Sequence, residues 1–214
     1  MNYRAIEATN TKTRRLAYIQ ALVLLLKSGN FSRVQLMERI ARWSEENAEN
    51  LRRYWVHTGE ITSTRQNSAV SRYIDLATSL GLIAPISGVY RYTRLGLVLI
   101  TLLENMREIS TNPFHLSAVS RLFFAYLLLA RDADFLLLVT DYIVAHEKTS
   151  LSQMQREFKD TFVRRVTAKI MLCQDERIRR TLLDRRRDAD NWKKPERYSE
   201  HLIPPRLNLS LIHI

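Results

Sequence analysis

The sequence predicts a mainly helical protein with one small β-hairpin, and three observations lead to this fold class. Apolar residues recur at helical spacing along most of the 214-residue chain, whereas glycine and proline, which break helices, number only five each. Serine followed three residues later by glutamine, a capping-box pattern that begins helices, occurs at Ser32, Ser63 and Ser150. Strand-like composition around a turn is found in one short segment, Leu82–Thr93.

Three helices are expected before the hairpin. The first spans Arg14–Ser28 and ends at Gly29, which is suited to a helix C-cap. The second begins after a tight turn at the Ser32 N-cap, and the polar residues 44–60 are expected to extend it and then form a loop. The third helix spans Ser63–Leu80. Its apolar stripe consists of Val70, Tyr73, Ile74, Ala77 and Leu80.

The β-hairpin is expected directly after the third helix. Gly81 ends that helix, Ser87 and Gly88 suit a tight turn, and β-branched and aromatic residues flank this turn within Leu82–Thr93. Another helix is expected over "RLGLVLITLLENMRE", although Gly96 weakens its start because glycine disfavours helices.

The chain past Asn112-Pro113, a dipeptide typical of boundaries, is expected to be helical. The apolar segments "HLSAVSRLFFAYLLLA" and "DADFLLLVTDYIVAHE" predict two buried helices. A further helix begins at Ser150, and residues 161–194 form a basic helical region. This order of buried helix, short polar turn and capping box parallels the beginning of the chain.

Both ends of the chain are excluded from the expected domains. Residues 1–13 are polar and expected to be loose. Leu209–Ile214, "LSLIHI", matches what the transposon mosaic-end adapter of sequencing libraries encodes in one frame, so we interpret it as a non-native tail. A short native apolar tail is the alternative. Under the first interpretation the native sequence continues past Asn208.

The net charge indicates which classes of partner the protein is expected to bind. A net charge of +11 and a sequence pI near 10.1 favour polyanions, with nucleic acid the first candidate and an anionic membrane surface the second. The longest apolar runs are too short to span a bilayer, so no transmembrane segment is expected. Of the two candidates we expect nucleic acid as the partner and no membrane. Cys173 is the single cysteine, which excludes disulfides within the chain and fits a reducing, cytoplasmic setting.

Residues 14–110 resemble a winged helix-turn-helix domain. The matching features are the turn at Gly29–Phe31, the third helix closing in "LATSLGLI", and the hairpin "IAPISGVYRY" leading into "TRLGLVLI". The polar insert over residues 44–60 departs from the usual pattern. The resemblance implies that the third helix enters a DNA major groove and that the hairpin, the wing, touches the flanking backbone.

The parallel between the two halves extends this interpretation to the rest of the chain. We interpret residues 114–208 as a helical domain that forms an incomplete second winged-helix unit. The two halves share little sequence identity, so a helical domain unrelated to the first unit is the alternative.

The residues expected to contact DNA lie on the third helix, opposite its apolar stripe or near its start, and on the wing. Arg65 and Arg72 are placed to reach guanine edges or phosphates, and Arg91 and Arg94 are the phosphate candidates of the wing. A solvated face with a surface pair between Arg72 and Asp75 is the alternative. The full set is Thr64, Arg65, Gln66, Asn67, Ser68, Arg72, Arg91 and Arg94, without Tyr90 and Tyr92, of which at least one is expected to pack on the domain.

The sequence contains no pattern that supports catalysis, a metal or a cofactor. The five histidines lack metal-ligand spacing, and neither a phosphate-binding glycine loop nor a nucleophile elbow is found. The "RDAD" carboxylates after Arg131 and Arg187 lack a third ligand. The basic segment over residues 177–194 is interpreted as a solvated helix, with a second nucleic-acid contact or an acidic protein partner as the alternative.

The sequence thus predicts a cytoplasmic, non-enzymatic protein that reads duplex DNA with helix 63–80 and wing 82–93, as a transcriptional regulator or a DNA-recognition subunit. The alternative is a winged-helix interaction or oligomerisation module without specific DNA binding. In that case the apolar helices within residues 116–145 would form a dimer or subunit interface. Binding of RNA is a third option.

Overall fold

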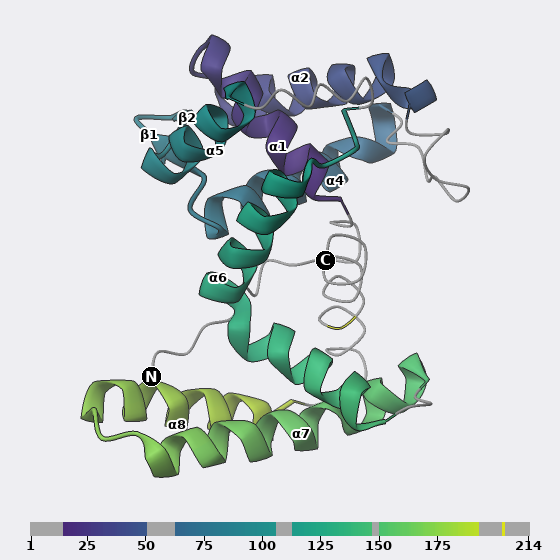
Figure 1. The fold of residues 1–214 in the computed structure, drawn as a ribbon. Helices are drawn as coiled ribbons and strands as arrows, with labels where there is room; N and C mark the ends of the chain where they lie inside the picture. Colours follow the sequence, from purple (N-terminus) through teal and green to yellow (C-terminus); the bar gives the residue numbers. More distant parts are fainter. Residues whose placement is uncertain (1–14, 51–62, 106–112, 147–149, 193–202, 204–214) are drawn as a thin grey trace.

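The computed structural model describes residues 15–50, 63–105, 113–146, 150–192 and 203, with side chains omitted for 63–69. In these residues the fold is mainly helical with one two-stranded antiparallel hairpin, which confirms the expected fold class at that level (Figure 1). The loose segment 1–13, most of the polar insert 44–60 and the tail 209–214 lie outside the described residues.

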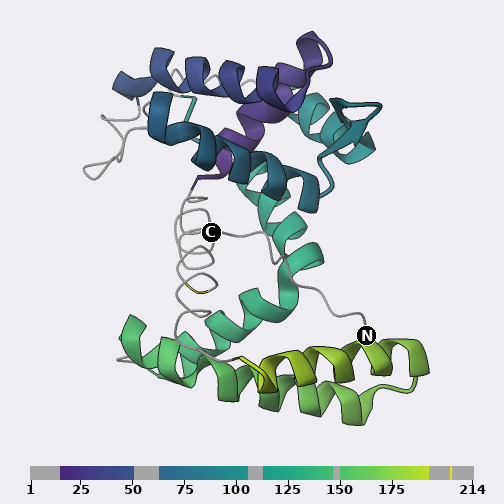
Figure 2. The ribbon, with the colours of Figure 1, turned by 180° about the vertical axis from the view of Figure 1, so that it is seen from behind.

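The first part of the chain forms the upper unit of Figure 1, in which α1 packs against α2, α4 and α5. Its elements are α1 (Leu16–Leu25), the 3-10 helix η1 (Leu26–Ser28), α2 (Arg33–Glu46), α4 (Ser63–Ser79), β1 (Ile83–Ile86), β2 (Val89–Tyr92) and α5 (Arg94–Glu104). The same arrangement is seen from behind in Figure 2, with the hairpin at the end of α4.

The core of this unit is built around α1, because seven of the ten side chains of that helix are apolar and buried. Tyr18 of α1 stacks on Tyr73 of α4 with ring centroids 4.8 Å apart, and its hydroxyl lies 3.0 Å from the Ser44 hydroxyl. Burial raises the pKa of Tyr18. The rings of Trp43 and Phe114 also meet Tyr18, so the first half of the chain closes around one aromatic cluster.

The start of α2 forms as the sequence predicts. The Ser32 hydroxyl accepts from the Gln35 backbone N–H at 3.3 Å, and the Ser32 N–H donates to the Gln35 side chain at 3.0 Å, which confirms the capping box. Just before this cap, Phe31 forms a β-bridge with Tyr90 of β2, whose N–H donates to the Phe31 carbonyl at 2.8 Å. The turn between α1 and α2 is therefore attached to the hairpin.

The junction from α4 through the hairpin to α5 is closed by backbone hydrogen bonds. Gly81 adopts a positive φ of 75°, and the Leu82 N–H donates to the Ala77 carbonyl at 3.0 Å, as in a Schellman helix end. In the hairpin, Ile83 pairs with Tyr92. The Ser87-Gly88 turn has positive φ at both residues, which is typical of a type I′ turn and confirms the predicted hairpin.

Gly96, expected to weaken the start of α5, is in fact required there, so that expectation was wrong. A Cβ at residue 96 would lie 2.3 Å from the Leu82 carbonyl oxygen, a distance too short for any side chain. The Thr93 hydroxyl caps α5 by accepting from the Gly96 N–H at 3.2 Å and also donates to the Gly81 carbonyl at 2.6 Å. The Thr-x-x-Gly sequence thus fixes α5 against the end of α4.

In the second half of the described chain, one long helix contributes to both hydrophobic cores. The two predicted buried helices are joined in α6 (Ala118–Ala145), which is kinked where Asp132 has φ −130° and ψ 20°. The first half of α6 packs in the core of the upper unit, and Phe135 and the residues beyond it belong largely to a second core. The kink lies in the "RDAD" sequence, at the junction between the two predicted helices.

The lower layer of Figures 1 and 2 consists of α7 (Leu151–Leu172) and α8 (Glu176–Asp190), which run side by side. Ser150 caps α7 as predicted, accepting from the Gln153 N–H at 3.1 Å, but the Gln153 side chain donates to Glu157 instead of completing a capping box. The basic region over 161–194 is divided by residues 173–175, and Asp175 caps α8. That residues 114–208 form a second winged-helix unit stays a prediction.

The apolar helices also bear on membrane insertion. Of the helices in the part of the chain that the structure describes, none combines the length and the apolar character that crossing a bilayer requires.

Candidate nucleic-acid interface

Arg33, the first residue of α2, forms hydrogen bonds to both α4 and the hairpin at their outer surface. Its guanidinium donates to the Asp75 carboxylate at 2.7 Å and to the Ser71 hydroxyl at 2.6 Å, both on α4. It also donates to the Tyr90 hydroxyl of β2 at 2.9 Å. One side chain therefore connects the start of α2, the middle of α4 and the hairpin.

The charge of Arg33 is matched by this environment. The hydrogen bond to Asp75 raises the pKa of Arg33, because the carboxylate favours the charged guanidinium. Both side chains are about one third exposed, so the pair lies at the surface without being fully solvated. Asp75 is paired with Arg33 and not with Arg72, the partner considered from the sequence.

Three of the arginines predicted to contact DNA are exposed. Arg72 lies on α4, Arg91 on β2 and Arg94 at the first position of α5. Among the described residues, no carboxylate forms an ion pair with any of the three. Their charges are therefore available to a polyanion, and whether they bind one stays a prediction.

The other five predicted contacts share one location. They occupy the first two turns of α4, a helix about 25 Å long, so the backbone carries them at the end remote from the hairpin. Their side chains lie outside the described part of the structure; they are Thr64, Arg65, Gln66, Asn67 and Ser68.

The two tyrosines of the hairpin differ from each other. Tyr90 is buried and accepts from Arg33, so it packs on the domain and cannot stack on a ligand. Tyr92 is 40% exposed. The expectation that at least one of the two tyrosines packs on the domain is therefore confirmed for Tyr90.

Sequence reasoning missed Arg33. Its partners follow it by 38 to 57 residues, and no local pattern connects an arginine at a helix start with an aspartate on a later helix. Asp75 itself could have pointed to such a residue. It is a carboxylate on a helix face otherwise made of arginine and serine, and this carboxylate needs a basic partner if the face is to bind DNA.

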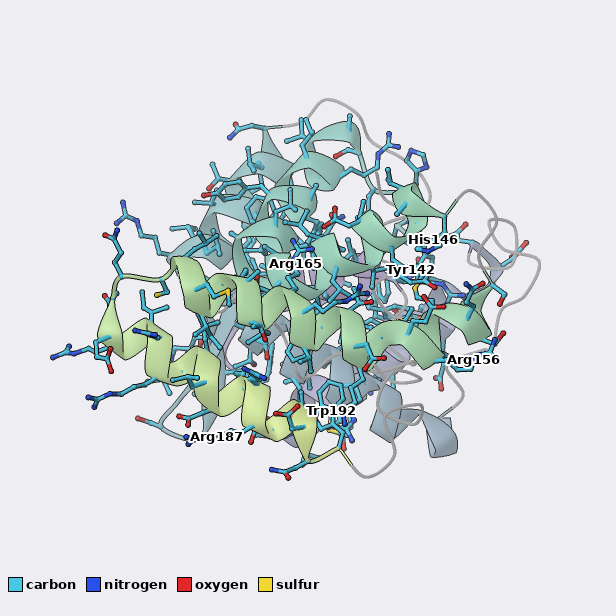
Figure 3. The ribbon with its side chains drawn as sticks, turned by 90° about the horizontal axis from the view of Figure 1, so that it is seen from below. Tyr142, His146, Arg156, Arg165, Arg187 and Trp192 are labelled. Carbon is cyan, nitrogen blue, oxygen red and sulfur yellow. The ribbon has the colours of Figure 1, made fainter. Side chains whose placement is uncertain are left out.

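The lower layer, α7 and α8, carries both positive and negative charges on its surface. Figure 3 shows α7 and α8 from below, with Arg156, Arg165 and Arg187 separated along the two helices. Arg165 pairs with Asp141 at 2.5 Å and Arg187 with Asp184 at 3.8 Å. α8 carries six arginines and four carboxylates, which favours the solvated-helix interpretation of this segment.

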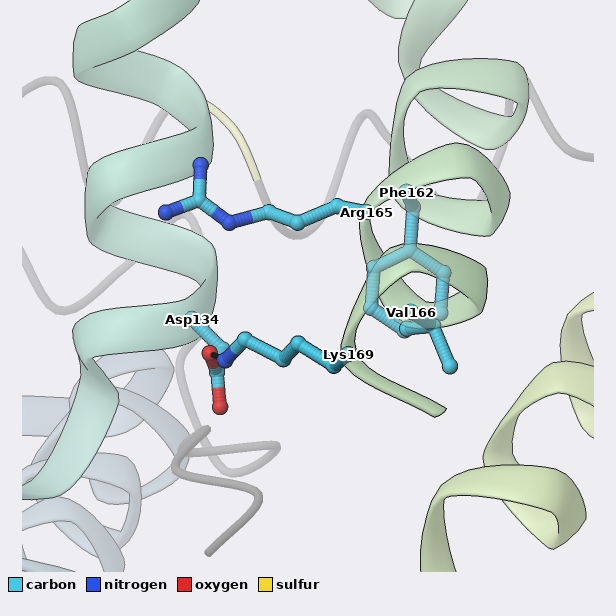
Figure 4. Close-up of a pocket in the computed structure, with 5 residues that line it drawn as sticks. All are labelled: Asp134, Phe162, Arg165, Val166 and Lys169. Carbon is cyan, nitrogen blue, oxygen red and sulfur yellow. Dashed lines mark ion pairs between the residues drawn. The ribbon is translucent and has the colours of Figure 1, made fainter. Parts of the chain in front are cut away.

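A small hollow between α6 and α7 is lined by an ion pair that joins the two helices. Figure 4 shows Lys169 reaching from α7 to the Asp134 carboxylate of α6, with Phe162, Arg165 and Val166 around them. At about 10 Å³, the hollow has room for roughly one water molecule. The buried Asp134 is neutralised by Lys169, so this pair serves the packing of α6 on α7.

A metal centre is not found within the described residues, where no group of three or more His, Cys, Asp or Glu side chains is placed to hold an ion. The geometry therefore leaves the surface of α4 and the hairpin as the main candidate site. Comparison with protein-family models, curated proteins and solved structures found no match to the chain.

Proposed function

We propose that residues 15–105 bind duplex DNA as a winged helix-turn-helix domain, with α4 directed to the major groove and the hairpin to the flanking phosphates. A cytoplasmic transcriptional regulator, or the DNA-recognition subunit of a larger assembly, would use such a surface. The observation that carries the proposal is the exposure of Arg72, Arg91 and Arg94, unpaired among the described residues, on a helix and hairpin that are fixed to each other.

The order of the elements supports this proposal. A helix, a one-residue bridge at Phe31, two helices, a hairpin and a further helix follow one another, and the bridge pairs with β2. The Phe31–Tyr90 bridge and the Arg33 hydrogen bonds fix the hairpin relative to α2 and α4. A preorganised surface of this kind binds a rigid duplex without first ordering its own parts.

The charges on this surface also support the proposal of DNA binding. Asp75 is the one carboxylate of α4, and a bare carboxylate beside phosphates would oppose binding. Arg33 neutralises Asp75, so the positive charges of Arg72 and the hairpin are not offset. Neutralisation of phosphates by such arginines releases counterions and supplies affinity that falls as salt rises.

The test is a salt titration of duplex binding by fluorescence anisotropy. We expect wild-type protein to bind a labelled duplex at low salt and the double variant Arg72→Ala with Arg91→Ala to bind about tenfold or more weakly. We also expect its salt slope to fall by about two units. The matched control is Arg179→Ala with Arg186→Ala, which removes two exposed arginines of α8 and the same net charge.

Two results would contradict the proposal. One is the absence of measurable duplex binding by the wild-type chain at low salt. The other is an equal loss of affinity in the α4–hairpin variant and the α8 control, because that outcome would mean that only total charge matters. Competition with single-stranded and double-stranded RNA in the same assay separates DNA binding from RNA binding.

A second candidate function is a protein-interaction module, favoured by the exposed apolar residues of α6, which include Leu122 and Tyr126. Such a module would bind duplex DNA no better than the α4–hairpin variant does, and would form a stable oligomer or complex. Size-exclusion chromatography beside the anisotropy assay distinguishes the two functions.

A further inference from the structure

We infer that a second copy of this chain docks on the outward face of the first half of α6 and forms a weak antiparallel dimer. The inference concerns a surface remote from the Arg33 hydrogen bonds and does not depend on DNA binding. The surface, here named the α6 stripe, consists of Val119, Leu122, Tyr126 and Leu129.

The α6 stripe is large and open. Leu122 and Tyr126 are each 70% exposed, and Leu129 and Val119 are 44% and 37% exposed. The spacing of three, four and three residues places the four side chains in one row along the helix. The opposite side of the same segment is buried in the upper core; it consists of Ser120, Phe124, Leu127 and Leu128.

Between residues 118 and 130 the outward half exposes one polar side chain, Arg121, whereas a solvated helix normally exposes several. The positions that flank the α6 stripe are Ala118, Ala125 and Ala130, and Arg121 is the nearest charge. The second half of α6 is mixed, because Leu137 and Val144 are exposed there together with Thr140 and Asp141. A row of four exposed apolar side chains without polar residues among them is thus found on the first half.

A second copy fits the α6 stripe because its spacing is palindromic. An antiparallel copy places Val119 opposite Leu129 and Leu122 opposite Tyr126, so every stripe residue meets a stripe residue. The flanking alanines let the two helices approach closely. The same face thus supplies both sides of the interface, as a two-fold symmetric dimer requires.

Charge favours the antiparallel arrangement. Two copies of a chain with a net charge of +11 repel each other, but neither the α6 stripe nor its flanking alanines add a charge to that repulsion. A parallel pair would bring the two Arg121 side chains to the same level, whereas an antiparallel pair separates them along the axis. Opposed helix dipoles also favour the antiparallel pair.

The size of the α6 stripe sets the strength of the dimer. Residues 119 to 129 span about 15 Å of a helix about 10 Å wide. A stable interface buries about 800 Å² per partner, which is more than one helix face of this length provides. We therefore expect a concentration-dependent equilibrium between monomer and dimer.

The test is sedimentation equilibrium of the full chain without DNA, from about 1 µM to about 500 µM. We expect the wild-type mass to rise toward that of a dimer. Leu122→Glu puts a charge on an exposed position, so it leaves the fold intact and keeps the chain monomeric. The control Val144→Glu changes a residue of α6 that is 78% exposed and lies outside the α6 stripe, and it should behave like wild type.

The direction of the helices is tested by cross-linking in a Cys173→Ser background. A mixture of Val119→Cys and Leu129→Cys chains should form a mixed dimer with a short bismaleimide, and Val119→Cys alone should not cross-link to itself. Self-cross-linking of Val119→Cys without mixed dimers overturns the antiparallel pairing.

Three sedimentation results overturn the dimer: a monomeric wild type at the highest concentration, equal loss of dimer in the two glutamate variants, or an unchanged dimer in Leu122→Glu. In the first case a different protein or another segment of this chain covers the α6 stripe. Because no nucleic acid is present, these results are independent of whether the α4 surface binds DNA.

Discussion

At the residue scale, Gly96 shows how a tertiary contact overrides a local preference. Helix propensity counts a glycine at this position as unfavourable, which led to the expectation of a weak start for α5. The Leu82 carbonyl approaches so closely that only a residue without a Cβ fits. The sequence contained the Thr-x-x-Gly pattern, but the reason for its glycine lies in a backbone contact that no local rule contains.

We predict that Gly96→Ala destabilises the protein by about 2–3 kcal/mol, because the new methyl group overlaps the Leu82 carbonyl oxygen. In a helix without this contact, the same change would stabilise the protein by about 0.5–1 kcal/mol. The sign of the change in unfolding free energy therefore distinguishes the two cases. Urea unfolding measures the difference. Val98→Ala, at an exposed position of the same helix, should change stability by no more than about 0.5 kcal/mol. A stabilised Gly96→Ala variant would contradict the close approach.

At the element scale, the starts and ends of helices were predictable where a side chain or glycine caps them within a few residues. The capping box at Ser32 and the hairpin turn at Ser87 formed as expected, and at Ser150 the serine cap formed without the glutamine half of the box. The contacts that fix one element against another were not, because they join residues far apart in the chain. Arg33 is the clearest case, since its partners lie on α4 and β2.

We predict that Arg33→Gln lowers the free energy of unfolding by about 1–2 kcal/mol, through lost charge-assisted hydrogen bonds at a partly exposed site. Asp75→Asn in the same background should recover part of this loss, because the unpaired carboxylate is removed. Urea unfolding of the four proteins of this double-mutant cycle gives the coupling free energy. Strict additivity would mean that the pair is not formed. Arg42→Gln, which removes an exposed charge of α2, is the control.

The contact of α6 with α7 predicts a dependence on pH. The Tyr142 hydroxyl donates to the Glu157 carboxylate at 2.6 Å, and this hydrogen bond lowers the pKa of Glu157. Because the folded-state pKa is below the unfolded one, the contact contributes stability above the unfolded value, about 4.3, and loses it as pH falls through the folded value.

Tyr142→Phe should therefore reduce stability at pH 7, and this reduction should become smaller as pH falls below about 4.3 and Glu157 takes up a proton. Urea unfolding of wild type and variant at pH 7 and at about pH 3.5 measures this change. Tyr126→Phe, on the same helix but exposed, should have no effect at either pH. A Tyr142→Phe effect that stays constant across this range would rule out the contact with the ionised carboxylate.

At the scale of the whole molecule, two cores share one helix. The first half of α6 completes the upper core, the second half begins the lower one, and the kink at Asp132 separates them. The mainly helical class, the hairpin and the order of elements followed from periodicity, caps and turn residues. The joining of two predicted helices into α6 did not, because the burial of Asp132 and Asp134 at their junction depends on tertiary packing that no local pattern contains.

The candidate site was predictable to a similar degree. Of the predicted contacts, Arg72, Arg91 and Arg94 are exposed, and helical periodicity had placed Arg72 opposite the apolar stripe. The side chain that neutralises the one carboxylate among them was found only from the folded arrangement.

The central claim, that the hairpin and α4 face duplex DNA, is tested most directly by photo-cross-linking from single cysteines in a Cys173→Ser background. A cysteine-linked aryl azide at Ser87→Cys, in the exposed hairpin turn, is compared with one at Thr181→Cys, exposed on α8. With a labelled duplex at low salt, we expect a covalent protein–DNA adduct from position 87 and little or none from position 181. Equal yields from the two positions, or an adduct from position 181 alone, would contradict it.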